Sequence, residues 1–397
     1  MRATTAVAVA VAFLAVGCRG GGRDPVDGAG PATEGEATVM VDQVSGGPRE
    51  GVPSALDDPA NPAFPPPRVD VDEIISGGPP PDGIPAIDEP RFLRPGDVRT
   101  LGDQEPVIAF ELDGDARAYP LEILIWHEIV NDTVAGVPVT VTYCPLCNTA
   151  VAYDRRLGDR VLDFGTSGKL YFSALVMYDR QTESLWAHFT AEALVGVLAG
   201  QRLDTYPAAI VSWASWRDKH PDGLVLSRET GHQRSYGRNP YPGYDDVDRQ
   251  PFLFRGEVDG RLAAMERVVA MGRDTDPVAV RVDPLADAGV VEVTVDEERL
   301  TVWHLPGTGS ALDDVDTANG RDVGATGVFR PLVDGRQLSF ARDGGGFVDD
   351  QTGSDWDIFG TAIEGPLSGA RLEPVEHVDT FWFAWAAYQP ETRIEPA

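Results

Sequence analysis

The apolar positions between residues 100 and 230 fall mostly in short runs rich in β-branched and aromatic residues, and turn-forming residues separate these runs. Such a pattern is typical of β-strands joined by tight turns. We predict strands over residues 107–112, 137–143, 150–154, 169–178 and 184–189. Because short strands dominate, the sequence predicts a mainly β or α+β fold with a few short helices.

The exception to the strand pattern is residues 121–131, where apolar residues recur at helical spacing. Pro120 suits the first turn of a helix, since its missing N–H would have no partner there. We therefore predict a helix over this stretch that ends at Asp132 and Thr133. A second short helix is predicted over residues 212–219.

Two regions of the chain also resemble each other. Residues 177–186 align with residues 347–356, and scarce aromatic residues align further on. The aligned pairs are Trp213 with Trp382, Trp216 with Trp385, and Pro221 with Pro390. The beginnings of the two regions match through residues 111–114 and 257–260, which read Glu-Leu-Asp-Gly and Glu-Val-Asp-Gly.

These matches predict two tandem copies of one β-rich unit. We place the first copy at residues 68–228 and the second, degenerate copy at residues 251–397. The bridge between them, residues 229–250, is rich in Tyr, Pro and Gly. We expect it to be an ordered crossover that packs on both copies.

The first residues have the pattern of an export signal, with Arg2 before an apolar run that ends at Gly17-Cys18. The run is shorter than the about 20 apolar residues that cross a membrane, and no later run approaches that length. Residues 14–18 resemble the lipobox of bacterial lipoproteins. We therefore expect residues 1–18 to be a lipoprotein signal peptide and Cys18 to be lipidated; an ordinary secretory signal is the alternative.

Residues 19–67 are rich in Gly, Pro and acidic residues and contain one aromatic residue, Phe64. Such a stretch cannot bury enough apolar surface to offset the entropy lost on ordering, so we predict a disordered tether. Together, signal and tether predict an exported protein that is lipid-anchored to the periplasmic or extracellular face of the cell envelope.

The charge of the chain limits its partners. It has 63 acidic and 33 basic residues, spread along the sequence, for a net charge of -30. Nucleic acids and anionic lipid headgroups are polyanions, so this charge disfavours both. We expect membrane contact through the lipid anchor only, and the sequence does not identify a protein or small-molecule partner.

The motif that carries chemistry is Cys144-Pro145-Leu146-Cys147, which lies between two predicted strands. Proline at the second position favours a turn. In thioredoxin-like proteins the cysteine pair opens a long helix, and the residues after Cys147 do not have a helical pattern. The turn is closer to the metal-holding knuckles of zinc ribbons and rubredoxin, although the chain has one such turn where those folds use two.

We predict that Cys144, Cys147 and His127 bind a transition metal, because two thiolates and an imidazole suit copper or zinc. His127 lies on the predicted helix, where residues four positions apart share a face. Further residues expected to support or extend this ligand set are Glu128, Asn131, Asp132 and Met177, whose thioether would favour copper(I). His188 is a reserve ligand.

Two other interpretations stay open. Cys144 and Cys147 could cycle as a thiol–disulfide redox pair, or the protein could be an adhesion or scaffold module without chemistry. At the equivalent places the second copy has Leu305 and Thr308, yet it keeps the tryptophans. The unit therefore does not need the cysteines to fold, which favours a functional role for them. The sequence does not decide whether the protein is an enzyme.

Several motifs together resemble domain-of-unknown-function family 3179, over nearly all of the chain after the tether. They are residues 84–88, Ala118-Tyr119-Pro120, residues 126–132, residues 142–147, residues 164–168, residues 177–186 and Asn239-Pro240-Tyr241. The resemblance implies a bacterial or archaeal protein, often exported, and carries no biochemical activity over to this chain.

Overall fold

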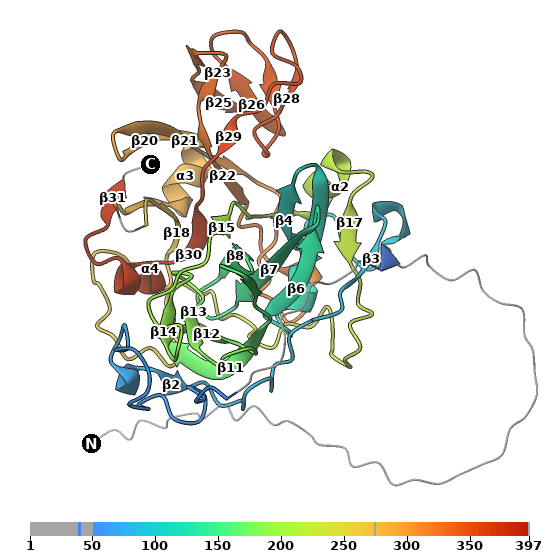
Figure 1. Cartoon of the computed structure of the whole chain (residues 1–397). Coiled ribbons are helices and arrows are strands. Elements are labelled where there is room, and N and C mark those ends of the chain that lie inside the picture. The colour runs from blue at the N-terminus through green and yellow to red at the C-terminus, as the bar shows by residue number, and fades with distance from the viewer. Residues whose placement is uncertain (1–38, 41–50, 274, 396–397) are drawn as a thin grey trace, which may run out of the picture. The chain divides into compact units, whose positions relative to one another are not determined.

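The structure, a computed structural model, describes residues 39–40, 51–273 and 275–395, and its secondary structure is mainly β (Figure 1). The predicted mainly β fold is confirmed. The α-helices of the described ranges are α1 Leu121–Leu124, α2 Trp213–Lys219, α3 Val282–Ala288 and α4 Trp382–Tyr388. The predicted signal peptide, Cys18 and most of the tether lie outside the described residues.

The first copy contains three sheets and a short hairpin. The first sheet has the order β1 (Val39–Met40), β3 (Arg91–Leu93), β17 (Leu224–Leu226), β5 (Asp115–Pro120), β4 (Pro106–Leu112) and β16 (Ala209–Ser212). The second has the order β15 (Thr205–Tyr206), β8 (Thr149–Asp154), β7 (Val137–Cys144) and β6 (Ile129–Val134). The third has the order β14 (Ala193–Val195), β13 (Leu185–Ala187), β12 (Ala174–Asp179), β11 (Phe164–Tyr171) and β2 (Ile75–Ser76). The hairpin consists of β9 (Arg156–Leu157) and β10 (Arg160–Val161).

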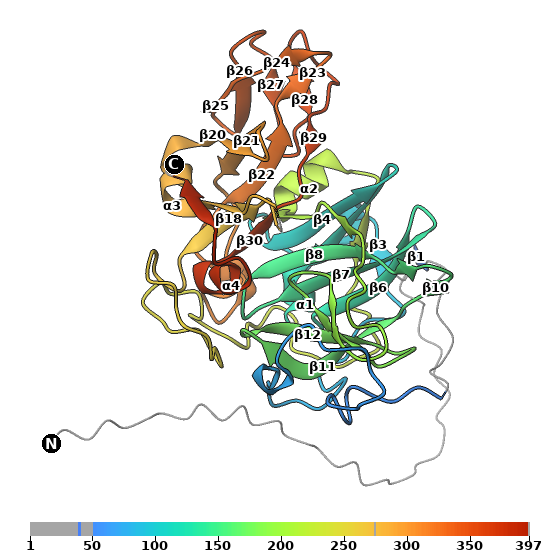
Figure 2. The same cartoon turned by 60° about the vertical axis from the view of Figure 1, so that its left-hand side comes forward.

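The second copy repeats this plan (Figures 1 and 2). Its first sheet has the order β30 (Val378–Phe381), β18 (Arg267–Met271), β19 (Val278–Arg281) and β31 (Arg393–Glu395). Its second has the order β29 (Glu373–Pro374), β22 (Ala325–Arg330), β21 (Glu298–Leu305) and β20 (Val290–Val295). Its third has the order β28 (Ala362–Glu364), β27 (Asp355–Trp356), β26 (Gly346–Asp349) and β25 (Phe340–Asp343), and its hairpin consists of β23 (Leu332–Val333) and β24 (Arg336–Gln337).

The pairing direction of the strands repeats as well. In the first copy β17 runs parallel to β5, and in the second copy β31 runs parallel to β19. The helix that precedes each of these last strands is α2 in one copy and α4 in the other. The chain is therefore built from two tandem copies of one unit, as the sequence predicts.

A buried hydrogen-bond network shows the repetition at atomic level. The indole Nε1 of Trp186 donates to Asp179 at 2.9 Å, and that of Trp356 donates to Asp349 at 3.0 Å. Each carboxylate also accepts the main-chain N–H and the hydroxyl of the threonine three residues further on. The repeated Asp-x-x-Thr-x-Ser-x-Trp pattern is thus a turn that satisfies its own buried carboxylate.

The two copies contact each other reciprocally. Strand β16 of the first copy lies against β22 of the second, and β30 of the second lies against β8 of the first. Because β16 corresponds to β30 and β8 to β22, the contacts have the form of a two-fold interface within one chain. The bridge joins both copies: Tyr244 donates to the carbonyl of Leu146 at 3.0 Å, and the carbonyl of Leu312 accepts the Tyr244 N–H at 3.1 Å.

The helix predicted over residues 121–131 is wrong beyond its first turn. Helix α1 ends at Leu124, the chain reverses at Glu128 with φ at +60°, and β6 begins at the next residue. A left-handed residue does not continue a right-handed helix, and the β-branched residues that open β6 favour a strand. The shared helix faces inferred for the metal ligands therefore do not exist. The second predicted helix matches α2, which Ser212 caps through a hydrogen bond from the Ser215 N–H.

Two further expectations differ from the structure. Residues 169–178 are not one strand: the chain turns at Phe172 and Ser173, both with positive φ, so that β11 and β12 form a hairpin. Residues 257–260, which we matched to the turn after β4, precede β18 and belong to no strand. The short polar match at that point was accidental, because the corresponding turn of the second copy joins β18 to β19.

The last part of the predicted tether lies on the first copy. Ala55 is fully buried, and its N–H donates to the carbonyl of Glu183 at 3.3 Å. The N–H of Arg68 donates to the carbonyl of Leu194 at 2.9 Å. From about residue 51 the chain therefore contacts the folded unit, although its composition alone favours disorder.

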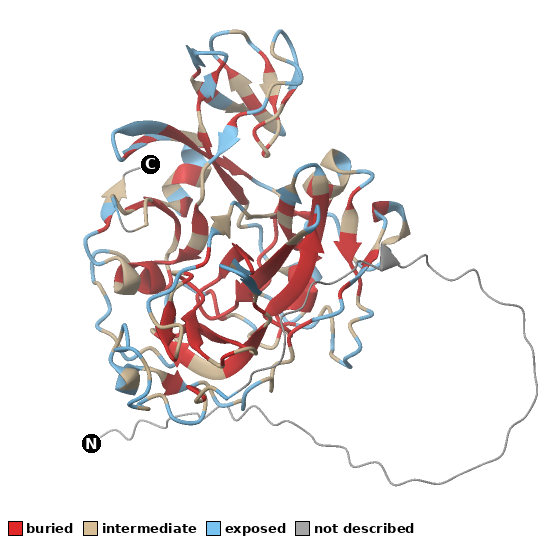
Figure 3. Cartoon of the chain, in the orientation of Figure 1, coloured by how far each residue is buried: buried red, intermediate tan, exposed pale blue. Residues whose placement is uncertain are grey.

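Burial differs between the copies (Figure 3). Strands β6, β7, β8 and β12 of the first copy are buried along almost their whole length. Strands β20 and β25 of the second copy alternate between buried and exposed residues, as a sheet with one solvated face does. The Cys-Pro-Leu-Cys motif follows β7 and therefore lies in the more enclosed copy.

Removing either indole donor should destabilise the fold. We expect Trp186→Phe and Trp356→Phe each to lower the free energy of unfolding by about 1–3 kcal/mol, because a buried carboxylate loses a donor. Urea unfolding followed by far-ultraviolet circular dichroism measures this. Trp216→Phe is the matched control, since the buried Trp216 Nε1 has no partner within the described ranges. An equal loss in the control would contradict the hydrogen bond as the cause.

Candidate functional site

The cysteine motif forms the turn between β7 and β8. Cys144 ends β7, and it is the direct cross-strand partner of Thr149, the first residue of β8. Pro145 supplies the fixed φ that a turn uses, and Asn148 adopts a positive φ of +53°, which asparagine tolerates well. The predicted turn between two strands is therefore present.

The second copy and the bridge hold this turn in place. The carbonyl of Cys147 accepts hydrogen bonds from the hydroxyl of Thr380 at 2.9 Å and from the N–H of Phe381 at 3.2 Å, both at β30. Tyr244 of the bridge donates to the carbonyl of Leu146. The second copy and the bridge, which have no cysteines, thus hold the backbone of the cysteine motif in place.

The two thiols are free, buried and unequal. Burial alone raises the pKa of the Cys144 thiol, but hydrogen bonds from the Cys147 thiol and from the N–H groups of Leu175, Cys147 and Leu146 outweigh it. The pKa of Cys144 therefore lies below its ordinary value. Burial, together with the neighbouring Cys144 sulfur, raises the pKa of Cys147 well above the usual range. The Cys147 thiol, which donates to the main-chain carbonyl of Cys144 at 3.8 Å, is thus the harder of the two to ionise.

Glu128 occupies a backbone position that suits glycine. Its φ is +60°, and its carbonyl accepts the N–H of Tyr143 at 2.8 Å. In the second copy Gly289 fills the same role, with φ at +80° and its carbonyl accepting the N–H of His304 at 2.9 Å. Left-handed backbone costs a residue with a side chain about 1–2 kcal/mol. The first copy therefore retains a glutamate at a place where folding favours glycine.

The carboxyl group of Glu128 lies beside the thiolate. Its side chain is buried, and in the described part of the chain no hydrogen bond or ion pair ends on it. Burial, reinforced by the charge of Cys144, raises its pKa well above the usual range. Tyr241 lies within electrostatic reach of both groups, and burial raises its pKa as well. The surroundings of Glu128 therefore favour the neutral form of its carboxyl group.

His127 does not offer a free lone pair to a metal. Its Nδ1 donates to the carbonyl of Pro85 at 2.7 Å, so its Nε2 is the unprotonated nitrogen, and this atom accepts the hydroxyl proton of Tyr236 at 2.7 Å. Burial lowers the pKa of His127 to about 4, which keeps the ring neutral. Both ring nitrogens are engaged away from the cysteines.

The other residues predicted to support the metal have partners of their own. Asn131 donates to Asp88 and to the carbonyl of Phe164, and Asp132 accepts from Arg117 and Tyr119. Met177 is buried in β12 opposite Trp186. Over residues 51–273 and 275–395, no three His, Cys, Asp or Glu side chains gather as metal ligands would. Cys144 and Cys147 share one turn and Glu128 interacts electrostatically with Cys144, whereas His127 bonds to other partners.

His188, the reserve ligand, lies one strand away from the thiolate. Its main-chain N–H donates at 3.1 Å to the carbonyl of Leu175, the residue whose own N–H bonds to Cys144. The ring is fully buried, and neither nitrogen has a partner among the residues that the structure describes. Burial lowers its pKa to about 3, so the ring is neutral.

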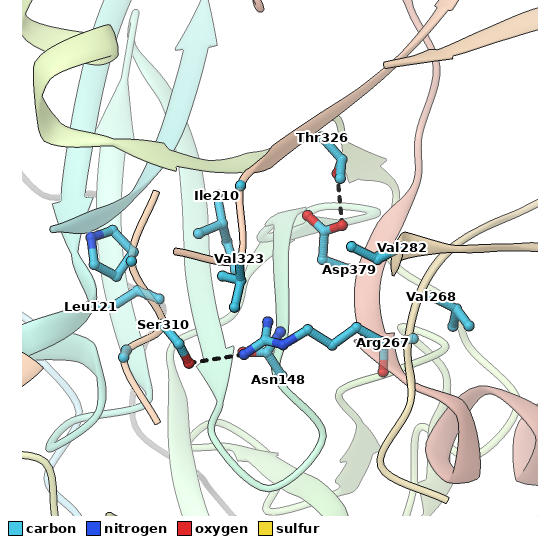
Figure 4. A pocket seen from close by; sticks show the side chains of 15 residues that line it. Leu121, Asn148, Ile210, Arg267, Val268, Val282, Ser310, Val323, Thr326 and Asp379 are labelled. Carbon is cyan, nitrogen blue, oxygen red and sulfur yellow. Dashed lines mark hydrogen bonds between the residues drawn. The ribbon is translucent and has the colours of Figure 1, made fainter. Parts of the chain in front are cut away.

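A small cavity lies behind the turn, between the copies (Figure 4). Its volume is about 30 Å³, and its walls include Asn148 from the turn and Arg267, Ser310 and Thr326 from the second copy. Arg267 donates to Ser310 at 2.9 Å. A space of this size holds one or two water molecules and no organic ligand.

The comparisons with known proteins show a family. The sequence family described as "Protein of unknown function (DUF3179)" matches residues 81–392, and the chain therefore belongs to it, as its motifs indicated. The matched region covers most of both copies. No curated protein and no solved structure matches the chain. No helix in the described ranges is long and apolar enough to cross a membrane.

The sequence analysis expected Glu128 near the cysteines as a supporting residue, but it placed the residue on a helix and missed its left-handed backbone. A comparison of the two copies would have found it, because aligning their strands makes Gly289 the equivalent of Glu128. A glycine in one copy and a glutamate in the other mark a position whose backbone is unusual.

Relieving the backbone at Glu128 should stabilise the protein. We expect Glu128→Gly to raise the free energy of unfolding by about 1 kcal/mol, since glycine accepts a positive φ without a steric penalty. Ala135→Gly, in an exposed turn with φ at +50°, is the control that relieves the same strain without removing a buried carboxyl group. Chemical denaturation measures both variants. A loss of stability in Glu128→Gly alone would mean that the carboxyl group holds the fold together.

The unequal thiols should titrate separately. In a Cys18→Ser background, thiolate absorbance at 240 nm against pH should rise first for Cys144 and only at much higher pH for Cys147. Cys147→Ala removes a hydrogen-bond donor from the thiolate, so the pKa of Cys144 should increase. An unchanged Cys144 pKa in this variant would contradict the proposed hydrogen bond.

Proposed function

We propose that this protein is an exported, lipid-anchored cell-envelope protein whose Cys144 and Cys147 form a dithiol–disulfide redox centre. One observation carries the proposal: two free, buried cysteines share one turn, in surroundings that lower the pKa of Cys144 and raise the pKa of Cys147. A redox pair needs this division, because the thiolate is the nucleophile and the second thiol resolves the product.

The chemistry is a two-electron exchange. Oxidation forms a sulfur–sulfur bond between Cys144 and Cys147, sends two electrons to the oxidant and releases the proton of the Cys147 thiol. Reduction by an external dithiol reverses these changes. The Leu175, Cys147 and Leu146 N–H groups favour Cys144 as the sulfur that carries negative charge. The N–H groups therefore lower the cost of forming the reactive thiolate.

Binding of copper or zinc by the same two sulfurs is the competing proposal. Two soft thiolates suit either ion. The engaged nitrogens of His127 leave the pair without the third ligand that we predicted. The residues present do not fit a closed zinc site, so no step of the redox chemistry is derived through a metal. The scaffold interpretation has no observation of its own in its favour.

The location is proposed from the sequence. The lipobox-like residues before Cys18 support a lipid anchor, and an exported compartment is one in which a disulfide persists. The net charge of -30 supports the absence of a nucleic acid partner. Membrane contact is proposed through the lipid anchor alone.

Redox titration tests the function. Full-length protein in a Cys18→Ser background should interconvert between two free thiols and one disulfide in dithiothreitol buffers, as measured by alkylation and mass spectrometry. Cys144→Ser and Cys147→Ser should each abolish the disulfide and keep the fold, because the second copy folds with Leu305 at the place of Cys144.

Metal analysis of the same protein, purified without chelator, separates the two proposals. Substoichiometric copper and zinc together with a reversible disulfide supports the redox centre. One equivalent of metal that is lost in Cys144→Ser, with no disulfide at any potential, would refute the redox function in favour of a metal site.

A further inference from the structure

The dithiol is almost closed to solvent, which limits what reaches it. Cys147 is 0 % exposed and Cys144 is 2 % exposed. Leu146 and Glu128 beside them are each 8 % exposed, and Tyr241, which lies within electrostatic reach of Cys144, is half-buried. Exchange with a protein disulfide requires a third sulfur in line with the attacked bond, and a folded partner cannot bring one to a site this deep. A substrate of a few atoms needs a much smaller displacement of the covering side chains.

The charge around the site adds a second limit. The whole chain carries a net charge of -30, and the site itself places the Glu128 carboxyl group near the thiols. An anionic peptide thiol or disulfide would approach against this field, whereas an uncharged molecule would not. Size and charge together select a small neutral oxidant.

The carboxyl group of Glu128 can supply the proton that one class of small neutral oxidants, the hydroperoxides, requires. When a thiolate attacks a hydroperoxide, the departing oxygen leaves as hydroxide or alkoxide, which is a poor leaving group without a proton. Glu128 lies beside Cys144, its carboxyl group has no other partner among the described residues, and it occupies a strained backbone position that its counterpart leaves to glycine. A buried carboxyl group without another partner in the described ranges, held there at a cost in stability, has the place of a proton donor.

We infer that the oxidising substrate of the Cys144–Cys147 pair is a small, uncharged hydroperoxide, and that Glu128 gives the departing oxygen its proton. The inference rests on the proposed redox function and names its substrate class. It uses the exposure and the position of the three side chains.

The steps balance with hydrogen peroxide as the substrate. The Cys144 thiolate attacks one oxygen, the oxygen–oxygen bond breaks, and the departing hydroxide takes the Glu128 proton and becomes water. The Cys147 sulfur then displaces the oxygen of the Cys144 sulfenic acid, and the Cys147 proton leaves with it as a second water. Glu128 regains a proton from solvent. In sum, one thiolate, one thiol, one peroxide and one proton give one disulfide and two waters.

Two oxidants applied to the reduced full-length protein in a Cys18→Ser background test the inference. Hydrogen peroxide needs a proton for its leaving group, whereas 2,2′-dithiodipyridine is a small neutral disulfide whose leaving group needs none. We expect Glu128→Gln to slow disulfide formation by hydrogen peroxide about 100-fold, within the range of general acid catalysis, and to leave the reaction with dithiodipyridine unchanged. In Cys147→Ser, peroxide should leave a sulfenic acid at Cys144 that dimedone labels.

The remaining outcomes overturn the inference in distinguishable ways. If dithiodipyridine forms the disulfide and hydrogen peroxide does not, the substrate class is wrong and the redox function stands. If Glu128→Gln slows both reagents equally, the glutamate is a structural residue and not a proton donor. If neither reagent forms a disulfide, the redox function and the inference fail together.

Discussion

The carbonyl oxygen of Cys147 is the atom on which the arrangement of the site depends. It accepts the hydroxyl of Thr380 and the N–H of Phe381 from the second copy, and the hydroxyl of Thr149 from the following strand. Fixing this peptide fixes the turn, and the turn directs the N–H groups of Leu146 and Cys147 at the Cys144 sulfur. The electrostatics of the thiolate are therefore set by a peptide that β30 holds in place.

The two copies of the fold therefore have different roles. The first copy carries the thiols, the strained glutamate and a four-residue turn, residues 145–148. The second copy has Gly289 and Leu305 at the equivalent places, and residues 306–324 replace the short turn. Both copies keep the Trp–Asp network that stabilises their third sheet. The second copy is thus relaxed where the first is strained, and it acts as a support.

The sequence predicted those parts of the fold that local patterns determine. Short β-branched runs located β4, β7 and β8, and the aligned tryptophans found the duplication. The pattern failed at Glu128, because apolar residues before and after it continue at helical spacing while one left-handed residue redirects the chain. Helical periodicity does not register a single backbone reversal.

The candidate site, like the fold, was predicted only in part. The Cys-Pro-Leu-Cys turn followed from proline and its flanking strands. Glu128 was expected near the cysteines, though on a helix, and the partners that engage His127 were not predicted, since they lie in distant segments. The proximity of Glu128 follows from the reversal after α1, and the engagement of His127 follows from Tyr236, 109 residues later in the chain.

The reciprocal contact of β16 with β22 and of β30 with β8 has a consequence for how such a unit exists alone. A polypeptide that ended after the first copy would expose the edge that β30 covers and would leave the Cys147 peptide without two of its donors. The symmetry of the contact offers a remedy, because a second identical molecule presents β16 where this chain presents β30. Within one chain the second copy always lies at this edge, so it holds the turn in place without carrying reactive groups of its own.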